Sequence, residues 1–144
     1  MRIGSDRRTP AVDPPFEVLA PDGQTMPFVF ASPHSGRVYP KAFLQATRLD
    51  GTAIRRSEDS FVDEIVAAAP TLGAPLLKAH FPRAFVDPNR EPYELDPTMF
   101  HEALPAHVNT RSPRVLAGLG TIARVVRDGA EIYRQRLPLA EALA

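Results

Sequence analysis

Short apolar runs, broken by proline and glycine, predict the strands of this chain. Phe16–Leu19 has the length of a short edge strand, and the turn Pro21-Asp22-Gly23 closes it. Residues 27–32 form a continuous apolar run, which is typical of a central strand buried on both faces. Two more strand candidates, separated by Pro82, are residues 76–81 and 84–86.

Apolar residues at three- and four-residue spacing predict two helices between these strands. Pro40 suits the first position of a helix, and residues 42–49 continue it as an amphipathic segment. The run Ser57-Glu58-Asp59-Ser60 is typical of a cap before a second helix. Gly73 ends that second helix, and its apolar face comprises Phe61, Ile65 and Ala68.

The last third of the chain is less regular. Residues 90–115 show no sustained periodicity, and a connection of this length is more often functional than inert. Residues 121–133 allow two interpretations, because Asp128-Gly129 favours a hairpin while the same glycine weakens a helix. Residues 139–144 resemble the start of a helix. Strands that alternate with helices indicate the α/β class, in which ligands bind at the carboxyl ends of strands.

Composition narrows the classes of function. The 144 residues carry 17 basic and 17 acidic side chains, so charge gives no support for nucleic acid as a partner. No apolar stretch approaches the roughly 20 residues of a membrane span, and we expect a soluble, cytoplasmic protein. With no cysteine, a metal would be held by histidine and carboxylates. Residues 1–14 are polar and proline-rich, which predicts a disordered arm.

His34 is the first candidate for chemistry. It follows the apolar run of residues 27–32 and precedes Ser35-Gly36, a turn that lets the backbone approach a ligand closely. Neutral imidazole is the commonest metal ligand and suits zinc. The alternative is a histidine that only hydrogen-bonds the end of a strand.

Four acidic residues open the second predicted helix. Asp59 is the best candidate to face His34 and complete part of a metal site, and Asp63, four residues on, would orient the histidine. The alternative is that these carboxylates only complement the helix dipole. The four residues are Glu58, Asp59, Asp63 and Glu64.

The segment Asp87-Pro88-Asn89-Arg90 carries the sharper signal. The fork of Arg90 matches a carboxylate, and the amide of Asn89 can donate beside it. Asp87 would orient one of these groups or neutralise Arg83, four residues earlier. The alternative is an ordinary surface turn, because Asp and Asn are common turn residues. Both this segment and His34 follow predicted strands, which places them in one site.

Five blocks of sequence, in one order, resemble the N-formylglutamate amidohydrolase family. They run through most of the chain from Pro15 onward, and together they are far more specific than any one motif. The blocks are ASPHSGRVYP at 31–40, RRSEDSFVDE at 55–64, FPRAFVDPNREPYELDP at 81–97, HVNTRSPRV at 107–115 and GLGTIARVV at 118–126.

The resemblance implies a three-layer, zinc-peptidase-like α/β sheet with flanking helices. It also implies metal-dependent hydrolysis of N-formyl-L-glutamate, or a similar N-acyl amino acid, to formate and glutamate, usually in histidine degradation. By this likeness His34 becomes a zinc ligand, and Asn89 and Arg90 bind a carboxylate of the substrate. Asp59 as a further ligand and Arg83 as a further anchor are inferences from position.

Two features depart from the family and its relatives. Related deacylases carry a His-x-x-Glu pair of ligands, whereas Arg37 stands three residues after His34. Family members are also considerably longer, so we expect residues 15–144 to be the N-terminal portion of an amidohydrolase domain, with an incomplete sheet and little activity alone. The alternative is a truncated, catalytically inactive fragment that folds partly or associates with a partner chain.

Overall fold

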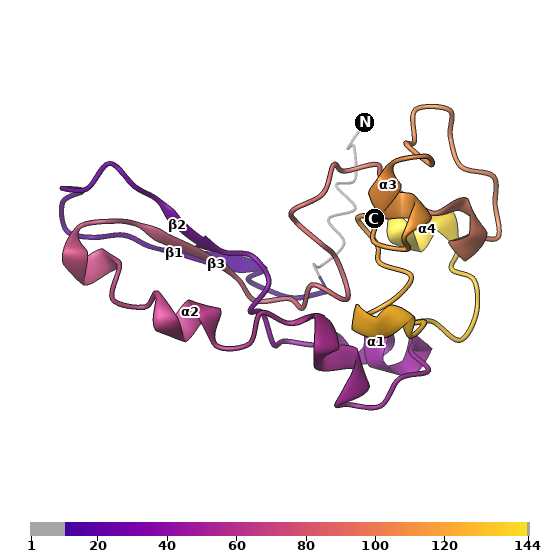
Figure 1. Ribbon diagram of the computed structural model, residues 1–144, viewed down its shortest axis with the longest axis horizontal. Coiled ribbons are helices and arrows are strands. Elements are labelled where there is room, and N and C mark those ends of the chain that lie inside the picture. Colours follow the sequence, from indigo (N-terminus) through magenta and orange to yellow (C-terminus); the bar gives the residue numbers. More distant parts are fainter. Residues whose placement is uncertain (1–10, 144) are drawn as a thin grey trace, which may run out of the picture.

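The fold is α/β, as predicted, with one small mixed sheet and short helices. The computed structural model describes residues 11–143, so most of the predicted arm lies outside the described residues. Figure 1 shows the sheet and α2 towards one end of the molecule, and α3 and α4 towards the other. The strands are β1 (Phe16–Leu19), β2 (Phe30–Ser32) and β3 (Leu76–Ala79), and the helices are α1 (Lys41–Ala46), α2 (Val62–Ile65), α3 (Pro113–Leu116) and α4 (Leu139–Ala142). Single 3₁₀ turns are η1 (Ala53–Ser57), η2 (Pro70–Leu72), η3 (Pro97–Met99) and η4 (Arg127–Gly129).

The sheet has the order β1-β3-β2, in which β1 is antiparallel and β2 parallel to β3. β1 has the predicted bounds. The predicted central strand, however, is wrong in two respects: β2 covers only the last part of residues 27–32, and it lies at the edge of the sheet. Residues 22–31 are all exposed. A continuous apolar run is typical of a strand that is buried on both faces, but the described residues do not bury this strand.

The described end of the predicted arm is attached to the sheet. Val12 is buried, and the carbonyl of Pro14 accepts a hydrogen bond from Nδ1 of His80, at 2.9 Å. The carbonyl of Pro15 accepts from the backbone N–H of His80. Residues 11–15 therefore pack beside the end of β3.

The first two helices are shorter than their periodicity predicts. Pro40 precedes α1 as its cap, and Phe43 is the one α1 side chain that is buried. The predicted cap at residues 57–60 is wrong: Phe61, at a φ of 65°, precedes α2 without a side-chain hydrogen bond. The apolar face of this helix is exposed, with Ile65 outermost.

Residues 84–86 form a turn, so the prediction of a strand there is wrong. The carbonyl of Pro82 accepts from the N–H groups of Phe85 and Val86, at 2.9 and 3.4 Å. Proline has a fixed φ and no N–H, which favours a turn over a ladder. This turn redirects the chain after β3 and brings Asp87 back toward the sheet.

Two hydrophobic clusters hold the rest of the molecule together, and we call residues 39–57 and 84–143 the packed region. The region is buried but mostly irregular, and residues 90–115 contribute to it despite their lack of periodicity. The first cluster comprises Phe43, Ile54, Ala84, Ala123, Val126 and Ile132. The second comprises Leu95, Met99, Phe100, Val108 and Ile122.

The chain reverses at Asp128-Gly129, as the hairpin interpretation requires. Both residues have positive φ, 70° and 76°, which is the signature of a type I′ turn. Val125 and Glu131 form an antiparallel bridge across the turn. Among residues 11–143, no helix is long and apolar enough to cross a membrane.

Candidate functional site

The predicted site residues meet at one edge of the sheet. β2 and β3 run parallel, so their carboxyl ends lie on the same side. His34 follows β2, and the segment carrying Asp87 follows β3. Nε2 of His34 lies 2.8 Å from Oδ1 of Asp87, and both side chains are buried. The expectation that these two segments converge is met.

Asp87 is the centre of the site, with four donors around its carboxylate. Oδ1 accepts from His34 and, at 3.0 Å, from the backbone N–H of Asn89. Oδ2 lies 3.1 Å from Nε of Arg83 and 3.3 Å from Nη2 of Arg90. Burial opposes ionisation, but the hydrogen bonds from His34 and Asn89 and the charge of Arg83 outweigh it and lower the pKa of Asp87 to about 2. The carboxylate is therefore ionised at neutral pH.

The ionised Asp87 determines which nitrogen of His34 carries a proton. A carboxylate can only accept, so Nε2 of His34 donates. The other nitrogen, Nδ1, faces Oδ2 of Asp59 at 3.3 Å. His34 is 7% exposed, whereas Asp59 is 50% exposed. The Nδ1 edge of the ring thus faces the more exposed of the two carboxylates.

Ser35 and Gly36 hold the His34 loop in place. The hydroxyl of Ser35 donates to the backbone carbonyl of Asp59 at 2.9 Å and accepts from the N–H of Asp63 at 3.3 Å. A Cβ atom on Gly36 would overlap the backbone carbonyl of Phe81, so only glycine fits there. The role of Ser35 was not predicted from the sequence, although its position directly after His34 indicated one.

Arg90 and Arg83 approach Asp87 differently. The side chain of Arg90 is 7% exposed; Nε donates to the carbonyl of Leu119 and Nη1 to the carbonyl of Asn89, each at 2.8 Å. Arg83 is more open and binds Asp87 through Nε. Asn89 is exposed. The three predicted substrate residues therefore share one neighbourhood, and the guanidinium of Arg90 is the most rigidly held.

The predicted acidic group does not act as a unit. Asp59 faces His34, but Asp63, which was expected to orient the histidine, instead binds Nη2 of Arg37 at 2.9 Å. Arg37 also binds Glu64. The side chain of Glu58 is buried and accepts a hydrogen bond from the hydroxyl of Tyr39 at 2.6 Å. Asp87, from the other strand end, occupies the orienting position that the spacing assigned to Asp63.

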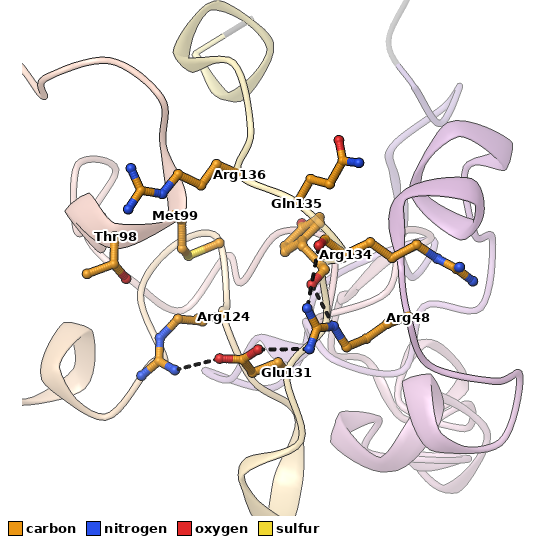
Figure 2. Close-up of a pocket in the computed structure, with 9 residues that line it drawn as sticks. Arg48, Thr98, Met99, Arg124, Glu131, Arg134, Gln135 and Arg136 are labelled. Atoms are coloured by element: carbon orange, nitrogen blue, oxygen red, sulfur yellow. Dashed lines mark hydrogen bonds and ion pairs between the residues drawn. The ribbon is translucent and has the colours of Figure 1, made fainter.

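Two cavities lie elsewhere, with volumes of about 330 and 420 Å³, and none of the predicted site residues lines either one. The wall of the first contains four arginines. Figure 2 shows Glu131 between Arg48 and Arg124, at 3.2 and 3.6 Å, with Arg134 and Arg136 directed away from one another. The first cavity therefore gives no converging cationic site, and the chemistry-bearing residues remain those around His34.

The two residues that the sequence predicts as metal ligands, His34 and Asp59, lie in contact with each other. Within residues 11–143 no group of three or more histidine, aspartate or glutamate side chains is arranged to hold a metal ion. Asp87 is not a third ligand, because it binds the opposite nitrogen of the ring.

Comparison with known proteins identifies the family of this chain. A family model described as N-formylglutamate amidohydrolase matches residues 26–144. The chain therefore belongs to the N-formylglutamate amidohydrolase family, in agreement with the resemblance of the sequence blocks. No curated protein matches the chain.

A solved structure of the same family supports this assignment. The crystal structure of N-formylglutamate amidohydrolase from Ralstonia eutropha JMP134 is 35% identical, with a TM-score of 0.78. The match covers 88% of this chain and 44% of that chain. The present chain therefore spans less than half the length of its solved relative.

Proposed function

We propose that this chain carries the first metal ligands and the carboxylate-binding arginines of an N-formylglutamate amidohydrolase. Membership of the family supports this proposal, and so does the arrangement of His34 between two carboxylates. The proposal includes the three-layer, zinc-peptidase-like sheet of the family and a place in histidine degradation. The observation that carries it is the contact between Nδ1 of His34 and Asp59.

The distance of that contact is compatible with two ligands of one zinc ion. A ring nitrogen and a carboxylate oxygen approach each other with a cation between them, either a proton or a metal. A tetrahedral zinc with bonds of about 2.0–2.1 Å separates its ligands by roughly 3.3 Å. The observed separation is 3.3 Å, longer than the usual charge-assisted hydrogen bond of about 2.7–2.9 Å. His34 and Asp59 therefore fit the metal.

Asp87 supports the histidine from behind. Histidines that bind metals usually donate their other N–H to a carboxylate, which fixes the tautomer and makes the ring a better ligand. Asp87 accepts from Nε2 of His34 in this way. Its own position is fixed by the backbone of Asn89 and by Arg83 and Arg90. When bound, the zinc would polarise the scissile carbonyl and activate water.

The same arginines are suited to hold a small dicarboxylate substrate. Nε, one Nη1 proton and one Nη2 proton of Arg90 contact protein acceptors, and a guanidinium has five N–H groups. Arg90 thus keeps N–H groups for a substrate carboxylate, next to the exposed amide of Asn89. Anchoring the glutamate end would orient the formyl amide toward the ligands at His34.

Zinc binding tests the proposal without needing turnover. We expect zinc, measured by titration calorimetry, to bind the wild-type chain and to lose affinity at least about tenfold in His34→Ala and Asp59→Asn. Cobalt substituted for zinc should give visible absorption bands that the same variants lose. His107→Ala is the control, because His107 packs on Tyr93 away from the site. Equal zinc affinity in wild type and His34→Ala would contradict the proposal.

Substrate binding is tested separately, in the full-length context of a related enzyme into which residues 26–144 are grafted. Release of formate from N-formyl-L-glutamate is the assay. Arg90→Lys should raise KM, because lysine lacks the fork that matches a carboxylate. Val38→Ala, at an exposed position, is the control. The second candidate is a catalytically inactive chain, and it would be favoured if the graft bound zinc but released no formate.

A further inference from the structure

The side chain of Glu58 is buried beside the candidate site, and the proposed function gives it no role. It is 3% exposed, whereas the side chain of Asp59, the next residue, is 50% exposed. Oε1 of Glu58 accepts a hydrogen bond from the hydroxyl of Tyr39 at 2.6 Å and lies 3.3 Å from Nε of Arg55. Burying a carboxyl group is costly without such partners, so Tyr39 and Arg55 determine where the Glu58 side chain lies.

The hydroxyl of Tyr39 is held in place by the packed region. The ring of Tyr39 stacks on that of Phe43, with centroids 6.2 Å apart, and Phe43 belongs to the first hydrophobic cluster. The guanidinium of Arg55 lies over the Tyr39 ring, 5.8 Å from its centroid. Burial, and then the hydrogen bond to Glu58, raise the pKa of the Tyr39 hydroxyl well above its usual value, so this hydroxyl stays protonated and donates. The packed region thus presents a fixed donor to Glu58.

The backbone links the position of Glu58 to the direction of Asp59. Glu58 has extended dihedral angles, φ −68° and ψ 139°, and in an extended segment successive side chains point to opposite sides. On one side Glu58 contacts Tyr39 and Arg55. On the other side Oδ2 of Asp59 lies 3.3 Å from Nδ1 of His34, and the N–H of Asp59 donates to the carbonyl of His34 at 3.1 Å.

We propose that Glu58 is a positioning residue, which holds the Asp59 carboxylate at Nδ1 of His34. Its connection with metal binding rests on the proposed function, in which His34 and Asp59 are the zinc ligands. Among residues 11–143, the Asp59 carboxylate has no side-chain partner other than His34. The direction of this half-exposed carboxylate therefore comes from its backbone, and the Glu58 side chain anchors that backbone to the packed region.

Zinc affinity and cobalt absorption in the 144-residue chain test the role in metal binding. Glu58→Ala removes the anchor and should weaken zinc binding at least about tenfold, as is usual for residues behind metal ligands, and should alter the cobalt bands. Glu58→Gln keeps an acceptor for the Tyr39 hydroxyl and should restore most of the affinity, and Tyr39→Phe, which removes only the donor, should fall between. Val108→Ala, in the second cluster, is the control for lost stability, and its zinc affinity should not change.

Hydrogen exchange in the zinc-free chain separates this inference from the proposed function. The N–H of Asp59 is bonded to the carbonyl of His34, so its exchange rate measures how often Asp59 leaves the His34 loop. The rate is taken relative to that of the N–H of Val126, in the first cluster, which corrects for a change in overall stability. We expect this ratio to rise at least about tenfold in Glu58→Ala and to stay near the wild-type value in Glu58→Gln.

The exchange ratio decides the inference even where zinc binding fails. If the wild-type chain does not bind zinc, the proposed function is wrong, and a raised ratio in Glu58→Ala still supports the positioning of Asp59. A wild-type ratio in both Glu58→Ala and Tyr39→Phe overturns the inference. An equal rise in Glu58→Gln and Glu58→Ala overturns it as well, because the acceptor for Tyr39 would then be irrelevant.

Discussion

We define residues 16–32 and 62–79 as the sheet region. The packed region and the sheet region differ in what orders them: side-chain burial in the first, backbone hydrogen bonds in the second. Ile132 and Phe100 in the packed region are almost completely buried, although little of the backbone around them is regular. In the sheet region the backbone is regularly hydrogen-bonded, yet Val18 and Phe28 remain exposed. No hydrophobic cluster of described residues includes the strands.

The difference shows that strand pairing and burial are separable in this chain. Backbone hydrogen bonds add only about 1 kcal/mol each to stability, whereas burial of apolar area supplies most of the driving force. The packed region therefore has a core of its own, whereas the sheet region lacks one among the described residues. The His34 site lies where the two meet, since His34 follows β2 and Asp87 follows the turn that leads into the packed region.

The largest effect is expected from Phe43→Ala, at the centre of the first cluster. The ring of Phe43 contacts those of Phe85 and Tyr133, with centroids 5.3 and 5.9 Å apart. We expect a loss of about 3–5 kcal/mol in the free energy of unfolding, measured in urea, because the cavity cannot collapse fully. Leu44→Ala, at the exposed neighbour, should cost less than about 1 kcal/mol. If both substitutions lowered the free energy of unfolding equally, the side chain of Phe43 would contribute no more to the core than the exposed side chain of Leu44.

A matched pair of valines compares the two regions directly. Val126 is buried in the first cluster, whereas Val18, on β1, is exposed. Val126→Thr places an unpaired hydroxyl in the core and should cost about 1–3 kcal/mol of unfolding free energy. Val18→Thr should change it by less than about 0.5 kcal/mol. A large cost at Val18 in the isolated chain would show that the sheet face is already covered.

Local patterns predicted the elements whose cause is local. The bounds of β1 and the reversal at Asp128-Gly129 follow from strand alternation and from the φ preferences of two residues, so both could be predicted. The position of β2 could not. An apolar run indicates that a segment is buried in the folded protein, but it does not show which segments lie beside it. The apolar pattern of residues 84–86 indicated another strand after β3, but Pro82 begins a turn there instead.

The candidate site was predictable from the sequence to about the same extent as the fold. The strand-end rule placed His34 and Asp87 together because it needs only the parallel order of two strands. The segment pattern predicted that Asp87 would orient Asn89 or Arg90 or neutralise Arg83, and it contacts all three. That His34 is the fourth donor could not be predicted, because it depends on the turn at Pro82. Asp63 was assigned to His34 by helical spacing, but Arg37 captures it. Spacing along the sequence does not show which of two distant partners a side chain will bind.

Asp96 tests electrostatics inside the packed region. Burial opposes its ionisation, but hydrogen bonds from Thr98 and Arg124 outweigh burial and hold the pKa of Asp96 below its usual range. Asp96→Asn keeps the acceptor for Thr98 and loses the pair with Arg124. We expect a loss of about 1 kcal/mol at pH 7, limited by solvent screening.

The pH dependence of the Asp96 effect follows from the sign of the shift. A lowered folded-state pKa stabilises the protein above the unfolded-state pKa, and this contribution disappears as pH falls through the folded-state value. The difference between wild type and Asp96→Asn should therefore shrink below about pH 4. Urea unfolding at pH 7, 5 and 3 measures it, with Asp22→Asn in an exposed turn as the control. A difference that grew on acidification would contradict the assigned pKa direction.

The smallest effect is expected from Arg37→Gln, beside the sheet region. The Arg37 guanidinium binds both Asp63 and Glu64, and these hydrogen bonds raise its pKa. Surface ion pairs are screened by water and salt and lose side-chain entropy on forming. The urea midpoint of Arg37→Gln should therefore stay close to that of the wild type, and the two should coincide at high salt. A midpoint that fell as far as that of Asp96→Asn would show that ion pairs, in the absence of a core, hold the sheet region in place.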